Sequence, residues 1–409
     1  MRKMNLKRGL NMISITKLLL DSHNYGDSLR YVEGAALAKY GVNKDKGPVV
    51  AWNCTKTCNL KCKHCYANSD SKKCKGELNL DEAKAFIDDL KDFKVPALLF
   101  SGGEPLMREN FLDIVAHASE RNLRSTISTN GTLLDKSMCK FLKEKNVGYI
   151  GISLDGMGRN HDKFRGITGA FDLALKGIRN CQEVDQKVGL RFTINKNNYK
   201  ELEDVFKLIK EEKIPRVCFY HLVYSGRGNE MMNEDISKEE TREALDLIIE
   251  KAVEFGPEVE ILTVDNHADG VYTYLKSMEI FKDKSERILN LLRTNGGNRS
   301  GMAFANVDFY GNVHADQFTW QYTFGNVKEE KFSSIWKNSD HEILNGLRNR
   351  KELLKGRCRN CKWLNVCNGN FRSRAEAVHG DFWAEDPACY LTDNEIRIYM
   401  HLDTINIFM

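Results

Sequence analysis

The stretch VVAWNCTKTCNLKCKHCY, residues 49–66, joins an apolar run to four cysteines that fall within twelve positions. The run is short and apolar, which predicts a buried strand. After it, Cys58, Cys62 and Cys65 are separated by three residues and then by two. Closely spaced thiols are typical of metal ligands. The stretch therefore predicts a metal centre at the carboxyl end of the first strand of a sheet.

The segment that follows repeats a strand and helix pattern. The predicted strands are residues 49–54, 97–102, 124–129, 149–154, 190–195 and 217–222. Between them, apolar residues recur at steps of three and four, which is the period of a helix with one buried face. Six such repeats predict a parallel sheet with right-handed crossovers, either open or closed into an incomplete barrel.

Polar and glycine-rich segments stand at the predicted strand ends. SGGEP (residues 101–105) follows the second strand, and TNG (residues 129–131) follows the third. Ser153 ends the fourth strand and Asn195 ends the fifth. In open α/β sheets and in α/β barrels, chemistry gathers at the carboxyl ends of the strands. We therefore predict that these segments converge with the cysteines on one active-site rim.

Charge and hydropathy restrict the function of the whole chain of 409 residues. Its 61 Lys and Arg against 57 Asp and Glu are too balanced for a nucleic-acid-binding surface. No run approaches the roughly 18 apolar residues of a membrane helix. The basic start lacks a cleavage site, and Lys17 interrupts its apolar run, which disfavours a signal peptide. We expect a cytoplasmic protein that starts at Met1 or at Met12, the latter leaving residues 1–11 as a frayed leader.

The twelve cysteines are unevenly distributed. In a reducing cytoplasm they do not predict a disulfide framework. A second cluster near the end of the chain consists of Cys358, Cys361, Cys367 and Cys389. Zinc is an alternative to iron and sulfur at both clusters, with Cys54 as a further ligand at the first. Three thiolates on a [4Fe–4S] cluster would leave one iron open to a small chelating ligand.

The segment CNLKCKHCY resembles the Cx3Cx2C signature of the radical S-adenosylmethionine superfamily. The resemblance implies a partial (β/α)6 barrel of the TIM type in which Cys58, Cys62 and Cys65 hold a [4Fe–4S] cluster. S-adenosylmethionine (SAM) then chelates the fourth iron, and its reductive cleavage gives a 5′-deoxyadenosyl radical. Cys54 is expected to be a bystander at the end of the strand.

The resemblance also implies which residues of the rim bind SAM. They are Gly102, Gly103, Glu104, His64, Ser153 and Asn195. SGGEP resembles the GGE-P segment of the superfamily, in which Glu104 would hold the methionine ammonium. His64 has the position that packs near the adenine. Ser153 and Asn195 resemble positions that contact the ribose or carboxylate, with strand-end capping as the alternative. For Arg165 we favour a surface salt bridge over a carboxylate contact.

The C-terminal cysteines resemble the SPASM/twitch extension of the same superfamily. The resemblance implies an auxiliary [4Fe–4S] cluster with full ligation by Cys358, Cys361, Cys367 and Cys389. Residues 301–316 predict a β-hairpin that turns at residues 310–312. A complete SPASM pattern has further cysteines where this chain has Asp316 and Phe371. We therefore expect two clusters in total and a different role for Asp316.

Most of the chain resembles the heme-synthesis branch of the superfamily, in stretches such as FYHLVYSGRG and TVDNHADG. The resemblance implies that the chain removes the two acetate side chains of 12,18-didecarboxysiroheme, an iron tetrapyrrole, to give Fe-coproporphyrin III. The implied electron donor is a flavodoxin or a ferredoxin. The candidate substrate contacts are His221, Tyr224, Arg227 and His267. A satisfied core histidine at His221 and a solvated loop charge at Arg227 are the structural alternatives.

Other functions remain open at this point. A ring-modifying enzyme of heme d1 synthesis would act on the same precursor. A SPASM peptide maturase is disfavoured because residues 1–47 are too short for a peptide-binding winged helix. A two-cluster electron carrier or a zinc-stabilised scaffold would need no chelating-ligand site.

We divide the chain into four segments. They are an N-terminal extension (1–47), the barrel core (48–225), a helical linker that covers the substrate (226–300) and the auxiliary-cluster domain (301–409).

Overall fold

The computed structural model describes residues 12–24, 26–31 and 47–397. The expected leader of residues 1–11 lies outside the described residues. No helix within these ranges is long and apolar enough to cross a membrane.

The described strands form one sheet in the order β1-β8-β7-β6-β5-β4-β3-β2-β9-β10. Their bounds are β1 (Met12–Ser14), β2 (Val49–Asn53), β3 (Leu98–Ser101), β4 (Ser125–Thr129), β5 (Ile150–Ser153), β6 (Val188–Ile194), β7 (Arg216–His221), β8 (Glu260–Val264), β9 (Phe304–Val307) and β10 (Val313–His314). Strands β2 to β8 pair in parallel in sequence order, and β1 pairs antiparallel with β8. The sheet therefore has the parallel core that the repeats predict.

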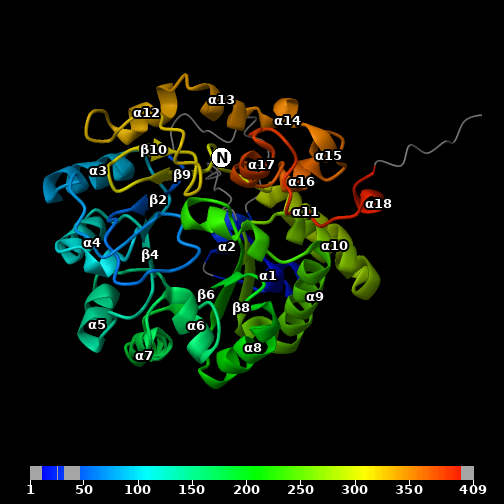
Figure 1. The fold of residues 1–409 in the computed structure, drawn as a ribbon, viewed down its shortest axis with the longest axis horizontal. Helices are drawn as coiled ribbons and strands as arrows, with labels where there is room; N and C mark the ends of the chain where they lie inside the picture. Colours follow the sequence, from blue (N-terminus) through cyan, green and yellow to red (C-terminus); the bar gives the residue numbers. More distant parts are fainter. Residues whose placement is uncertain (1–11, 25, 32–46, 398–409) are drawn as a thin grey trace, which may run out of the picture.

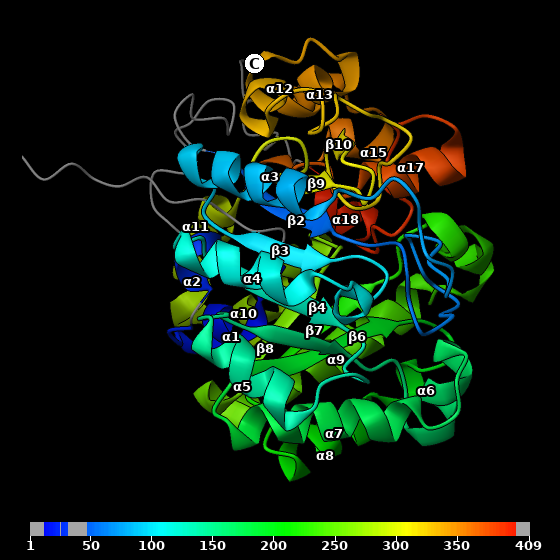
Figure 2. The ribbon, with the colours of Figure 1, turned by 90° about the vertical axis from the view of Figure 1, so that its left-hand side faces the viewer.

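Helices cover the outer face of this sheet (Figures 1 and 2). The α-helices of this part are α1 (Ile15–Leu20), α2 (Asp27–Arg30), α3 (Leu80–Asp92), α4 (Phe111–Glu120), α5 (Lys136–Glu144), α6 (Gly158–Arg165), α7 (Ala170–Glu183), α8 (Leu202–Glu211), α9 (Lys238–Phe255), α10 (Ala268–Ile280) and α11 (Ser285–Asn295). Short 3-10 helices include η2 (Pro105–Met107), η3 (Tyr199–Glu201), η4 (Gly226–Glu234), η5 (Gly256–Glu258) and η6 (Lys282–Lys284). Capping boxes start α3 at Asn79 and α9 at Ser237.

The C-terminal part lies beside β9 and β10, along one side of the molecule in Figure 1. Its helices are α12 (Phe332–Asn338), α13 (Glu342–Arg348), α14 (Arg350–Leu353), α15 (Gly356–Arg359), α16 (Leu364–Cys367), α17 (Arg372–His379) and α18 (Asp393–Ile396). The predicted hairpin is present, because β9 and β10 pair antiparallel and Gly311 lies in the turn with φ +94°.

All six predicted strands are present, but the sheet extends further than the sequence indicates. β8 pairs in parallel with β7, and β9 pairs in parallel with β2. Both strands lie beyond residue 225, so the sheet crosses the boundary that we placed there. β1 extends the same sheet from the segment that we expected to be an N-terminal extension.

The two faces of the sheet carry different side chains, because residues alternate along a strand. On the outer face, residues such as Ile127, Ile152 and Phe192 pack in the main hydrophobic core. On the inner face, β4 and β5 place the small polar residues Thr126, Ser128 and Ser153. Small residues leave space at the centre, so the curved sheet encloses a cavity.

Candidate active site

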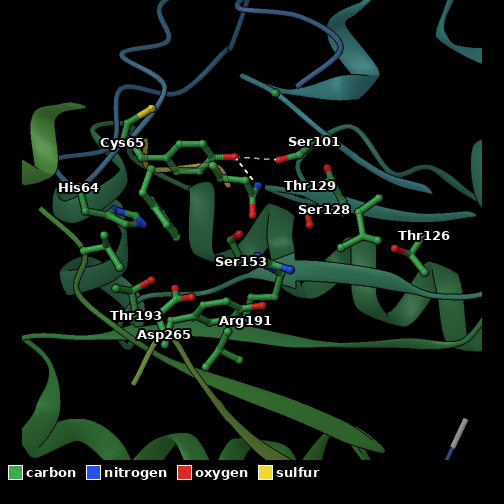
Figure 3. A pocket seen from close by; sticks show the side chains of 18 of the residues that line it. His64, Cys65, Ser101, Thr126, Ser128, Thr129, Ser153, Arg191, Thr193 and Asp265 are labelled. Atoms are coloured by element: carbon green, nitrogen blue, oxygen red, sulfur yellow. Dashed lines mark hydrogen bonds between the residues drawn. The ribbon is translucent and has the colours of Figure 1, made fainter. Parts of the chain in front are cut away.

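A cavity of about 250 Å³ lies on the inner face of the curved sheet. Residues from β3 to β8 and from the cysteine-bearing loop after β2 line it. Figure 3 shows His64 and Cys65 at one end, with Arg191, Thr193 and Asp265 across from Ser101. The cavity therefore joins the segments that the sequence places at separate strand ends.

The three thiols of the first cluster line this cavity. Burial raises the pKa of Cys58 to about 12 and raises the pKa of Cys62, and neighbouring thiols add to both shifts. This environment disfavours free thiolates, so a positive centre must compensate the charge of the ionised thiols. Cys54 does not line the cavity and is fully buried in the main core.

Two arginines hold the cysteine-bearing loop in place. Arg227 donates hydrogen bonds from Nε to the Cys62 carbonyl (2.9 Å) and from Nη1 to the Ser69 carbonyl (3.0 Å). Arg165 donates from Nη1 to the Cys62 sulfur (3.4 Å) and pairs with buried Asp155. The expected surface salt bridge of Arg165 is thus wrong, because its partner is in the interior. Arg227 is likewise no solvated loop charge.

His64 is partly buried and lines the cavity with the thiols. Its ring stacks on Phe164 at 4.8 Å, and its Nε2 lies 3.8 Å from an oxygen of Asp155. Burial lowers the pKa of His64 to about 4, so the imidazole is neutral at physiological pH. A neutral ring that lines the cavity can pack against an aromatic ligand without a charge to compensate.

The SGGE segment packs directly against the loop that leads to the cysteines. A Cβ atom at Gly102 would lie 2.5 Å from the Thr55 carbonyl oxygen, and Gly103 leaves equally little space beside Thr57. Glu104 is fully buried and accepts hydrogen bonds from Thr129 Oγ1 (2.7 Å) and the Asn130 amide (2.8 Å). Glu104 therefore ties the ends of β3 and β4 together.

Ser153 and Asn195 differ in their placement. Ser153 lines the cavity at the end of β5. Asn195 is fully buried, and its side chain donates to the Thr193 carbonyl (3.1 Å) and accepts from the Asn197 amide (2.9 Å). Asn195 is not among the residues that line the cavity. The geometry therefore supports the capping alternative for Asn195.

Two of the four candidate substrate contacts, His221 and Arg227, line the cavity. His221 Nε2 lies 2.9 Å from Asp269, which also accepts a hydrogen bond from the Tyr390 hydroxyl (2.8 Å). Burial alone would lower the pKa of His221, but Asp269 raises it above the ordinary value.

Tyr224 and His267 lie outside the lining of the cavity. The Tyr224 hydroxyl donates to Asp235 (2.7 Å). His267 stacks on Phe371, which itself faces the cavity. We find no support for a direct contact of either with a ligand in this cavity.

The four C-terminal cysteines lie in α15, in the turn after it, at the end of α16 and in the segment before α18. Burial raises the pKa of Cys367 far above its ordinary value, and Cys389, Cys358 and Cys361 each add to the shift. The four thiols therefore lie within the range of one another's charges. Among the described residues, no three His, Cys, Asp or Glu side chains converge on one metal ion. A [4Fe–4S] cluster needs a wider arrangement, because each thiolate binds a different iron.

Two acidic residues that face the cavity add to the site. Asp316 is buried and accepts hydrogen bonds from the Phe318 amide (2.9 Å) and from Thr319 (3.1 Å). Asp265 lies at the end of β8 with φ +68°, and burial raises its pKa to about 7. Sequence reasoning missed Asp265, although it stands in the quoted stretch TVDNHADG.

Comparisons with known proteins agree with this geometry. Residues 52–209 match the radical SAM superfamily, and residues 300–362 match an iron–sulfur cluster-binding domain named SPASM. The chain is 52% identical to Fe-coproporphyrin III synthase of Methanosarcina barkeri over 95% of this chain and 100% of that protein. This chain belongs to the radical SAM superfamily. It is also 42% identical to pre-heme d1 synthase of Dinoroseobacter shibae, over 88% and 90% of the two chains.

Solved structures of the superfamily share the fold. Streptococcus suis SuiB, in a crystal structure with bound S-adenosylmethionine, matches with a TM-score of 0.69 at 17% identity, over 87% of this chain and 80% of SuiB. The fold is thus that of a radical SAM enzyme with a C-terminal SPASM domain. Membership brings with it a [4Fe–4S] cluster that works with SAM, and an auxiliary cluster. The electron-carrier and zinc-scaffold alternatives are therefore rejected.

Proposed function

We propose that this radical SAM enzyme removes the two acetate side chains of 12,18-didecarboxysiroheme to give Fe-coproporphyrin III. The observation that carries the proposal is the 52% identity to Fe-coproporphyrin III synthase over the whole of that relative. When bound, the cluster and SAM supply a 5′-deoxyadenosyl radical. We place the reaction in the cytoplasm, where thiols stay reduced, with a flavodoxin or a ferredoxin as the electron donor.

We assign the cofactors to the two groups of thiols. Cys58, Cys62 and Cys65 hold the cluster that works with SAM, and this is supported by their shared place on the cavity wall. The auxiliary cluster is held by the four C-terminal thiols, Cys358, Cys361, Cys367 and Cys389. Their mutual effect on the pKa of Cys367 supports this set.

We assign SAM to the part of the cavity next to the first group of thiols. Gly102 and Gly103 bring the backbone close to the cysteine-bearing loop. The Glu104 carboxylate accepts hydrogen bonds from the methionine ammonium with the lone pairs that its existing hydrogen bonds leave free. His64, as a neutral ring, packs against the adenine, and Ser153 donates to the ribose or the carboxylate. All but Glu104 line the cavity.

The substrate would occupy the rest of the cavity. His221 and Arg227 are the two original candidate contacts that line it. His221 is oriented by Asp269 through Nε2, which leaves Nδ1 as its second polar atom for a substrate carboxylate. A polycarboxylate with an apolar ring suits a wall that combines cationic and aromatic groups.

The second candidate function is a ring modification of heme d1 synthesis on the same precursor. The 42% identity to pre-heme d1 synthase supports it. The two functions differ in the product, because one leaves Fe-coproporphyrin III and the other changes the propionate side chains.

The decisive experiment is an anaerobic incubation of the reconstituted enzyme with 12,18-didecarboxysiroheme, SAM and dithionite. We expect Fe-coproporphyrin III by mass spectrometry and 5′-deoxyadenosine as the co-product. Products with altered propionates would favour the heme d1 reaction. Formation of 5′-deoxyadenosine without any change in the tetrapyrrole would contradict both functions.

A further inference from the structure

Arg191 stands at the centre of the inner face of the sheet. It belongs to β6, where its neighbours Leu190 and Phe192 point outward into the core, and its own side chain lines the cavity (Figure 3). The guanidinium lies over the ring of Tyr220 of β7 at 4.5 Å. Arg191 takes part in none of the ion pairs of the described residues, and the neighbours with the largest effect on its charge are Tyr220, Cys218 and Tyr149.

The neighbouring backbone makes room for this side chain. Gly151 of β5 pairs in register with Gly189 of β6. A Cβ atom at Gly151 would lie 2.7 Å from Cδ of Arg191, and one at Gly189 would lie 2.7 Å from the Tyr149 hydroxyl. Two glycines facing each other in adjacent strands weaken a sheet unless a group must lie across them. Here the groups are the stem of Arg191 and the phenol of Tyr149.

Two buried hydroxyl groups beside Arg191 have no hydrogen-bond partner. They belong to Tyr220 and Tyr149, and both residues line the cavity. A buried polar group without a partner costs free energy, so such groups mark positions that a ligand can satisfy. The guanidinium can only donate hydrogen bonds and both hydroxyls can donate as well, so a ligand with acceptor atoms can satisfy all three groups.

Arg216 shows how the same fold treats an arginine with a structural role. Its guanidinium stacks on Tyr149 at 4.3 Å in the same way, but it also lies 3.3 Å from the carboxylate of Glu260. Asp265 faces the same cavity as Arg191, but the two form no ion pair. Arg191 lowers the pKa of Asp265 but forms no salt bridge with it, so its charge can still pair with a ligand, because a partly buried guanidinium needs an anion to offset its desolvation.

We propose that Arg191 and the Tyr220 hydroxyl bind one carboxylate side chain of the tetrapyrrole substrate and so fix the orientation of the ring in the barrel. The inference rests on the proposed function for the identity of the substrate. Ser153 pairs in register with Arg191, so this carboxylate site opens on the same space as the residue that we assign to SAM. A carboxylate bound there holds one edge of the macrocycle at the cofactor.

The test compares binding of two porphyrins to the reconstituted enzyme by anaerobic absorption titration. Coproporphyrin III carries four carboxylates, and its tetramethyl ester carries none. We expect Arg191→Gln to weaken binding of the acid by about tenfold to hundredfold, as for a lost charge-assisted hydrogen bond. Binding of the ester should stay unchanged, and Arg191→Lys should restore part of the affinity because it keeps the charge.

Two further variants separate this role from a structural one. Tyr220→Phe removes a hydroxyl that bonds nothing in the described structure, so it should leave the melting temperature unchanged and weaken binding of the acid about twofold to tenfold. Arg179→Gln removes an exposed arginine of α7 that pairs with Glu212, and should change neither affinity. The dissociation constant of SAM should be the same in all four variants.

The outcomes distinguish this site from the proposed function. If Arg191→Gln and Tyr220→Phe both bind the acid as tightly as the wild type, or lose affinity for SAM instead, the carboxylate site is wrong. If the wild type binds the acid through Arg191 but forms no Fe-coproporphyrin III, the carboxylate site is supported and the proposed reaction is contradicted. If the wild type forms Fe-coproporphyrin III but both variants keep full affinity for the acid, the proposed reaction is supported and the carboxylate site is contradicted.

Discussion

Arg165 Nη1 lies 3.4 Å from the sulfur of Cys62 while the same guanidinium pairs with Asp155. Arg165 ends α6, and Asp155 follows β5, so one side chain joins the cysteine-bearing loop to the end of β5. A cation beside a ligand thiol also favours its ionised form. The loop is therefore positioned, and its charge partly compensated, by the protein itself.

Replacement of Arg165 should destabilise the fold. Arg165→Gln leaves Asp155 buried without its cation, and we expect the free energy of unfolding to fall by about 3–5 kcal/mol. Although burial would raise it, Arg165 holds the pKa of Asp155 below its ordinary value in the wild type. The wild type therefore loses this stabilisation as the pH falls through the low folded pKa, whereas the variant lacks it already at neutral pH. Urea denaturation at pH 7 and at about pH 2 measures both effects, because the loss in the wild type begins only below the unfolded pKa of about 3.9.

The cysteines of the opening stretch should differ in their effect on iron content. Cys62→Ala should reduce the iron from about eight to about four atoms per chain and abolish cleavage of SAM. Cys54→Ala is the matched control, since Cys54 is buried in the core and does not line the cavity. It should keep both clusters and lose at most about 1–2 kcal/mol of stability. Equal loss of iron in the two variants would contradict the ligand assignment.

Gly103 should not tolerate a side chain. Gly103→Ala forces a methyl group against the Thr57 carbonyl, which also accepts the Glu104 amide (2.9 Å). We expect a loss of about 1–3 kcal/mol in stability and a weaker affinity for SAM, measured by calorimetry.

Gly158→Ala is the comparison for Gly103→Ala, because its Cβ would meet no atom within 4 Å. With φ +46° it should cost only about 1–2 kcal/mol for the left-handed backbone. Its affinity for SAM should equal that of the wild type. A matching loss of affinity in this variant would show that backbone strain, and not the contact with Thr57, is responsible.

Asp265 should make stability depend on pH near neutrality. Burial raises its pKa to about 7 in the fold, above the value of about 3.9 in the unfolded chain. The folded protein then binds the proton more tightly, so stability falls as the pH rises from about 4 to about 7. The slope of this contribution is about 1.4 kcal/mol per pH unit.

Asp265→Asn removes this contribution and keeps a residue that accepts φ +68°. The variant should gain stability over the wild type between pH 5 and pH 7, as measured by denaturant titration. Equal pH profiles for the two proteins would show that Asp265 titrates in its ordinary range.

Local sequence was sufficient for the repeating part of the fold. The six parallel strands follow from apolar runs and helical periods, because short-range patterns report which residues are buried. β8 was missed, although it completes the parallel part of the sheet, and β1 was missed because a three-residue strand carries too little pattern. The sheet also continues past residue 225, because the pairing of β8 with β7 and of β9 with β2 is decided between distant segments.

For the candidate site as well, some features follow from local sequence and others only from contacts between distant segments. The spacing of Cys58, Cys62 and Cys65 predicts an open cluster and indicates the superfamily, since ligand spacing is local along the chain. The three-dimensional contacts were needed to show that Asn195 caps its own turn, that Arg165 faces the interior and that Arg191 faces the cavity. The sequence pattern around an arginine in an apolar strand does not show which face of the sheet its side chain occupies. Its role depends on which charges and hydroxyls the neighbouring strands bring beside it.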